Sequence, residues 1–126
     1  MLPGRSVIDM RTRTLIVLLS VALFGCSKKK DDAESLRTAC EEKSDLKACN
    51  SLARSHFEGV GAPEDKDRAI LLFDRACSGG YTNGCENLNV LAGLYAQGGG
   101  VPKDSAKAAD LYQKACKGGV TAACGR

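Results

Sequence analysis

Two stretches of the chain carry apolar side chains at the spacing of one face of an α-helix. In each stretch the apolar positions recur at i, i+3, i+4, i+7 and i+8, the pattern of a helix that is buried along one side. Asp65 and Asp104 precede the two stretches as N-cap residues, and glycine pairs at 79–80 and 118–119 follow them. We therefore predict two helices, whose buried positions are Ala69, Leu72, Phe73, Ala76 and Cys77 in the first and Ala108, Leu111, Tyr112, Ala115 and Cys116 in the second.

A further helical face precedes each of these helices. Gly59, Gly61 and the glycines at 98–100 separate the members of each pair, because glycine is a poor residue for a helix interior. Each pair therefore predicts an αα-hairpin. The buried positions of its first helix are Cys49, Leu52, Ala53 and His56 in one copy and Leu88, Leu91, Ala92 and Tyr95 in the other.

The two hairpins are copies of one repeat. Residues 52–85 align with residues 91–124 at a constant offset of 39 and without a gap, and the segment that contains Leu36 and Cys40 is a partial earlier copy. Cys85 stands one turn earlier in its helix than Cys49 does, so we expect the first helix of the second copy to begin about one turn earlier. The chain thus predicts an all-α domain over residues 33–124, a short αα-hairpin solenoid.

Several motifs make the repeat resemble a known family. The segment from Gly98 to Asp104, Lys107-Ala108, Tyr112 and Lys114-Ala115-Cys116 are similar to the Sel1-like repeat, a TPR-like αα-hairpin. The added cysteines, spaced C-x7-C, resemble those of the cysteine-rich, secreted branch of that family. The resemblance covers roughly residues 33–124, and it implies a solenoid of Sel1-like repeats stapled by disulfides.

Six of the seven cysteines form three short-range pairs. In each pair one cysteine ends a helix and its partner opens the next helix across a turn, where two packed helices can approach within disulfide range. Such disulfides persist only in an oxidising compartment. A zinc site is the alternative, but zinc ligands are usually closer together and His56 is the only histidine. We therefore expect no metal and no other cofactor, and disulfides within the pairs Cys40 and Cys49, Cys77 and Cys85, and Cys116 and Cys124.

The N-terminal residues have the pattern of an export signal. Arg11 and Arg13 precede an apolar run of about ten residues, which is half of what a membrane-spanning helix needs. The run ends in Leu23-Phe24-Gly25-Cys26, which resembles the bacterial lipobox. The resemblance implies a lipoprotein signal peptide over residues 1–25, starting at Met1 or at Met10, and lipidation of Cys26. We expect a flexible charged tether over residues 26–32 and a site at the outer membrane facing the periplasm, with a free periplasmic or secreted protein as the alternative.

The charge balance excludes one class of partner. Without residues 1–25 the chain has 15 basic and 14 acidic side chains, so it has no electrostatic surplus for nucleic acid. Catalysis is weakly indicated, and we assign no catalytic residue. Ser27 with Lys30 and Ser44 with Lys47 match the Ser-x-x-Lys element of serine β-lactamases, but S-D-N and K-T-G are missing. A β-lactam-binding or β-lactam-hydrolysing protein, as some cysteine-rich Sel1-like proteins are labelled, is the alternative function.

Binding of a protein or peptide is the main functional expectation. Stacked helix pairs form a concave face that suits extended segments of a partner. The family resemblance places Asn87 on that face, and Ser51 occupies the matching place in the earlier copy. Arg54 and Gln97 are the further candidate contacts, and simple solvation is the alternative for each of these four residues. We expect a non-catalytic, lipid-anchored adaptor of the cell envelope whose partner the sequence does not name.

Overall fold

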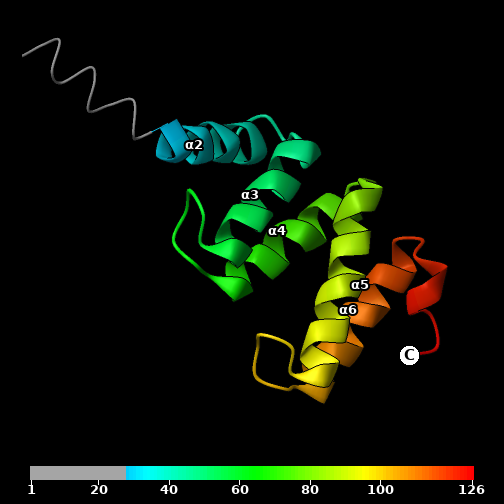
Figure 1. Ribbon diagram of the computed structural model, residues 1–126. Coiled ribbons are helices and arrows are strands. Elements are labelled where there is room, and N and C mark those ends of the chain that lie inside the picture. Colours follow the sequence, from blue (N-terminus) through cyan, green and yellow to red (C-terminus); the bar gives the residue numbers. More distant parts are fainter. Residues whose placement is uncertain (1–27) are drawn as a thin grey trace, which may run out of the picture.

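Five α-helices and one short 3₁₀-helix make up the part of the chain that the structure, a computed structural model, describes, residues 28–126 (Figure 1). The predicted signal peptide and Cys26 lie outside the described residues. None of the helices in residues 28–126 is both long and apolar enough to cross a membrane. The helices are α2 (Lys28–Glu41), α3 (Leu46–Glu58), α4 (Lys66–Ser78), α5 (Thr82–Gln97) and α6 (Ser105–Lys117), and η2 (Thr121–Ala123) follows them.

Aspartates begin three of the helices, because their side chains accept hydrogen bonds from otherwise unpaired backbone N–H groups. Asp65 Oδ1 accepts from the N–H of Arg68 at 2.9 Å, and Asp104 Oδ1 accepts from the N–H of Lys107 at the same distance. These are the two N-caps that the sequence predicted. Asp45 caps α3 in the same way.

Each helix packs mainly against its neighbours in sequence, so the chain forms a row of hairpins rather than a closed bundle (Figure 1). Helices α3 and α4 form the first complete hairpin, and α5 and α6 form the second. Helix α2 packs on α3 as the second helix of an incomplete earlier copy. The buried side chains form one continuous core along the row, which includes Leu52, Phe73, Leu88 and Leu111. The all-α solenoid predicted from the sequence is confirmed.

Helix lengths explain the difference in repeat length. Helix α5 has 16 residues and α3 has 13, so α5 is about one turn longer. Its three additional residues, 82–84, lie at the start and include the buried Gly84, and the buried Cys85 follows them. Helix α2 begins at Lys28, so residues 28–32, which the sequence assigned to a tether, are part of this helix.

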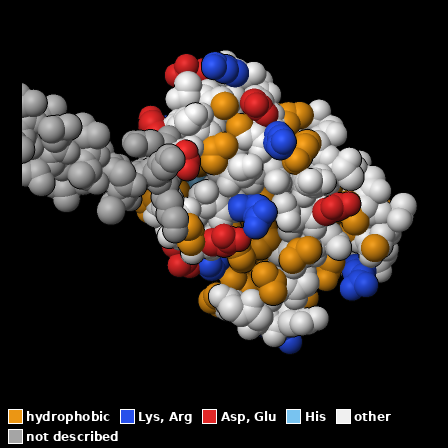
Figure 2. Space-filling view, turned by 45° about the horizontal axis from the view of Figure 1, so that its top comes forward, with side chains coloured by type: hydrophobic (Ala, Val, Ile, Leu, Met, Phe, Trp, Pro, Cys, Tyr) orange, Lys and Arg blue, Asp and Glu red, His pale blue; other side chains and the backbone are white. Residues whose placement is uncertain are grey.

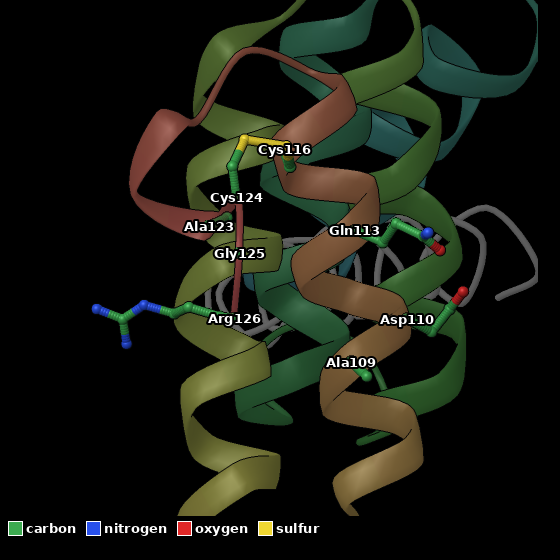
Figure 3. Close-up of a pocket in the computed structure, with 8 residues that line it drawn as sticks. All are labelled: Ala109, Asp110, Gln113, Cys116, Ala123, Cys124, Gly125 and Arg126. Atoms are coloured by element: carbon green, nitrogen blue, oxygen red, sulfur yellow. A yellow bond between two sulfur atoms is a disulfide. The ribbon is translucent and has the colours of Figure 1, made fainter.

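Three disulfides connect consecutive helices at their turns. Cys40–Cys49, Cys77–Cys85 and Cys116–Cys124 have Cα–Cα distances of 4.7, 4.6 and 4.9 Å, within the range that a disulfide requires. The first two lie in the core, whereas Cys124 is exposed. Figure 3 shows the third disulfide joining the end of α6 to the C-terminal tail. The predicted cross-linking of the solenoid by disulfides is therefore present.

Candidate binding face

A pair of side-chain amides connects the first helices of the two hairpins. Asn87 of α5 donates a hydrogen bond from Nδ2 to Oδ1 of Asn50 on α3, at 2.9 Å. Asn50 is 8% exposed and is the buried polar residue of the described core. An amide has two N–H donors and one oxygen acceptor, so this bond leaves Asn87 with one N–H and its oxygen. The pair can therefore hold the two helices together and still bind another polar group.

Two of the predicted contact residues lie beside this pair on α3. Ser51 is half-buried and Arg54 is exposed, and both line a shallow hollow of about 230 Å³ that also includes Leu36 and Val60. Arg54 Nη2 lies 3.6 Å from Oε1 of Glu58, and both side chains are largely exposed. Such a pair holds Arg54 only weakly, so its guanidinium remains available.

Helix α5 continues the surface. Val90, Leu94 and Gln97 follow Asn87 at intervals of three and four residues, which places the four on one side of the helix. Val90 is 60% exposed, and Gln97 is the exposed last residue of the helix. We call Asn50, Ser51 and Arg54 of α3 together with Asn87, Val90, Leu94 and Gln97 of α5 the α3–α5 face.

The structure adds neighbours to the four predicted contact residues. Asn87 contacts Asn50, which precedes Ser51 in α3. Asn50 and Val90 are additions that the sequence did not predict. The sequence did contain a signal for Asn50, because it is a polar residue among the apolar positions of α3. It contained no signal for Val90, because a single exposed valine on a helix is not informative.

Ser44, from one Ser-x-x-Lys element, lies in a turn, and His56, the only histidine, contacts a loop. Ser44 lies in the turn between α2 and α3 with φ of 54°, and within residues 28–126 no hydrogen bond joins it to Lys47. His56 Nδ1 lies 2.9 Å from the carbonyl oxygen of Pro63, so it holds the loop between α3 and α4. In the described part of the chain no group of three histidine, cysteine, aspartate or glutamate side chains is placed to hold a metal ion.

Charged side chains connect the second helices of successive repeats. Lys107 of α6 bonds to Asp67 of α4, and Lys114 Nζ lies 3.3 Å from Oδ2 of Asp74. The hydrogen bond to Asp67 raises the pKa of Lys107. Burial acts to lower the pKa of Lys114, but Asp74 and Asp110 outweigh it and the pKa is raised.

The side of the molecule shown in Figure 2 carries no large patch of one charge sign. On the side shown in Figure 2, acidic and basic side chains are interspersed, with small groups of hydrophobic side chains between them.

These features define a class of protein: an α-solenoid of hairpin repeats with polar residues on the face of its first helices. Comparison with protein families gives the particular family. The Sel1 repeat model matches residues 46–81 and 88–120, and the chain belongs to the Sel1 repeat family. Proteins of this repeat fold generally serve as scaffolds for protein interaction.

Solved structures agree with this assignment. A Sel1 repeat protein from Oxalobacter formigenes is 25% identical, with a TM-score of 0.51, over 75% of this chain and 37% of that protein. A protective antigen of uropathogenic Escherichia coli strains with an SLR fold is 34% identical, with a TM-score of 0.50, over 72% of this chain and 19% of that protein.

A cysteine-rich relative is also similar. Helicobacter pylori cysteine rich protein B is 28% identical, with a TM-score of 0.51, over 74% of this chain and 67% of that protein. No curated protein matches the chain in sequence. The chain thus spans well under half the length of two of these relatives and about two thirds of the third.

Proposed function

We propose that the protein is a lipid-anchored adaptor of the bacterial cell envelope, which binds an extended segment of a partner protein along the α3–α5 face. The bond between Asn87 and Asn50 carries this proposal, because it places paired amides in the middle of the face. An extended peptide presents alternating N–H and C=O groups, and a side-chain amide can pair with both. Asn87 retains one N–H and its oxygen for this purpose.

The neighbouring residues supply the rest of a peptide contact. Val90 offers an exposed apolar surface on α5, and Arg54 offers an exposed cation on α3. The hollow beside Ser51 can take a small side chain of the bound segment. A segment with an apolar residue flanked by an acidic one is complementary to this arrangement.

The location rests on the cysteines. Three disulfides favour an oxidising compartment, which in bacteria lies outside the cytoplasm. The resemblance of Leu23-Phe24-Gly25-Cys26 to a lipobox adds an anchor at Cys26. Together they support an adaptor held at the outer membrane and facing the periplasm.

Site-specific photocrosslinking in intact cells tests the binding face. A photoreactive residue at position 90 should give a defined adduct, and the same residue at Leu71, which is 66% exposed on α4, should not. Asn87→Ala and Arg54→Glu should each reduce the adduct at position 90. An adduct that forms equally at position 71, or that survives both substitutions, would contradict binding at the α3–α5 face.

Metabolic labelling with palmitate tests the anchor separately. Cys26→Ser should abolish incorporation of label and release the protein from the membrane fraction. Unchanged labelling in this variant would exclude Cys26 as the lipidated residue and would leave the binding face unaffected.

A further inference from the structure

Solvent reaches one of the three disulfides, Cys116–Cys124. Cys124 is exposed and Cys116 is half-buried, whereas the other four paired cysteines are at most 5% exposed. Cys116 and Cys124 both line a hollow of about 450 Å³ between α6 and the C-terminal tail, residues 121–126 (Figure 3). Neither the hollow nor the tail shares a residue with the α3–α5 face, so the chemistry of this disulfide is independent of the proposed function.

The other two disulfides are covered by the folded chain. Gly118, at the end of α6, lies directly against the sulfur atoms of Cys77 and Cys85. Cys40 and Cys49 are completely buried. Thiol–disulfide exchange requires a thiolate to reach a sulfur atom from solvent, so these two disulfides react only when the solenoid opens. Exposure therefore separates Cys116–Cys124 from the other two in reactivity.

Weak contacts hold the tail on α6 besides the disulfide. The N–H groups of Ala123 and Cys124 donate to carbonyl groups within residues 120–121 and not to α6. The small side chain of Ala123 is buried, and the guanidinium of Arg126 lies 5.7 Å from the centre of the Tyr112 ring. One buried methyl group and one cation–π contact at an exposed arginine contribute little to stability. Opening of the disulfide therefore releases the tail.

We propose that Cys116–Cys124 is a modification site for low-molecular-weight thiols, which form a mixed disulfide with Cys124 and thereby release the tail from α6. The thiolate sulfur forms a bond to Sγ of Cys124, the exposed member of the pair, and the bond between the two cysteine sulfurs breaks. Sγ of Cys116 leaves with the electron pair and takes a proton from water. A second thiol then attacks the mixed disulfide, so two thiols are oxidised to one disulfide while Cys116 and Cys124 are reduced.

The exchange changes the surface at one end of the row of hairpins. Ala109, Asp110 and Gln113 of α6 line one side of the hollow, and residues of the tail line the other. Release of the tail opens this side of α6 to solvent, while the two buried disulfides keep the hairpins cross-linked. The change is reversible, because the same exchange runs backwards with an oxidised thiol.

Reaction with reduced glutathione under native conditions tests the site. The oxidised chain carries Cys26→Ser, so that only the paired cysteines remain. Free thiols are blocked with N-ethylmaleimide at short times, and the products are mapped by mass spectrometry. We expect glutathione on Cys124 and maleimide on Cys116, at least about tenfold faster than any modification of the other four cysteines. Comparable rates at all three disulfides would overturn the proposal, and glutathione on Cys116 with Cys124 free would overturn the direction of attack.

NMR of the amide groups tests the release of the tail. After exchange, the signals of residues 121–126 should move to the positions of an unfolded segment, and those of α4 and α5 should stay. The double variant Cys116→Ser with Cys124→Ser should show the same tail signals without any thiol, and it should take up no glutathione. Unchanged tail signals after exchange would contradict the release, and glutathione uptake by the double variant would contradict the assigned site.

Discussion

At the scale of single residues, two glycines inside α5 have different roles. A Cβ atom on Gly84 would lie 2.8 Å from Cβ of Ala76 and from the backbone nitrogen of Cys77, both on α4. These atoms cannot rotate away, so only glycine allows the two helices to approach this closely. Gly93 has one atom within 4 Å of such a position, the hydroxyl oxygen of Tyr112 at 3.6 Å, which is an ordinary contact.

Alanine substitutions at Gly84 and Gly93 give a matched test of the contact between α4 and α5. Gly84→Ala should lower the free energy of unfolding by about 1–3 kcal/mol, as overpacking of a core does. Gly93→Ala should raise it by up to about 1 kcal/mol, because alanine favours the helix. Urea denaturation of the oxidised proteins measures both. Similar effects of the two substitutions would show that helix propensity, and not the approach of α4 to α5, determines the outcome.

Single residues also show which features of the structure could be predicted from the sequence. The hairpins, the caps at Asp65 and Asp104 and the cysteine pairs were predictable, because each depends on neighbours within a few turns of the chain. The bond between Asn50 and Asn87 was not, because it depends on how α5 lies against α3. Alignment of the repeats compares equivalent positions in the two copies and does not tell which side chains of α3 and α5 meet.

At the scale of helices, ion pairs join α4 to α6. Asp67 and Asp74 lie two turns apart on α4, and Lys107 and Lys114 have the same spacing on α6. Lys114 also lies 3.4 Å from Asp110 of its own helix. Since the side chains of Lys114 and Asp74 are 33% and 30% exposed, solvent screens part of their attraction.

Asp74→Asn should lower the free energy of unfolding by about 0.5 kcal/mol near neutral pH. The pKa of Lys114 is raised in the folded protein, so its contribution is fully present below its ordinary value of 10.5 and is lost as the pH rises through the higher folded value. The difference between the variant and the wild type should therefore disappear at alkaline pH. Urea titrations from about pH 8 to about pH 12, a range that spans the ordinary pKa of lysine, measure it.

Asp110→Asn is the control for this prediction. It removes the contact within α6 and leaves the one between helices, and Asp110 is more exposed than Asp74. Its effect should be smaller than that of Asp74→Asn at neutral pH. A difference from wild type that grows as the pH rises would contradict the assigned direction of the Lys114 shift.

At the scale of the whole molecule, the disulfides compensate for a short solenoid. Repeat proteins bury a continuous core by stacking, and the described chain has two complete hairpins and part of a third. The three cross-links close loops of nearly equal length, with sequence separations of 9, 8 and 8. In the chain-entropy description each is worth about 2.5 kcal/mol, so loop length alone does not distinguish them.

The three disulfides differ in the residues that pack against them. Gly118, at the end of α6, lies directly against the sulfur atoms of Cys77 and Cys85, so the second disulfide supports the contact between the two hairpins. The third disulfide fixes only the short tail that contains η2 (Figure 3). Replacing Cys77 and Cys85 together by alanine should therefore cost more than about 2.5 kcal/mol, and replacing Cys116 and Cys124 should cost that amount or less.

Equilibrium unfolding in urea of the two double variants, each with its other disulfides intact, measures this difference. The Cys77 and Cys85 variant should also unfold with a lower m-value or in two steps, because the hairpins on either side of the lost disulfide become less strongly coupled. The Cys116 and Cys124 variant should keep a single transition. Equal losses of stability with unchanged m-values would mean that the disulfides act through loop closure alone and that Gly118 adds nothing to the joint between the hairpins.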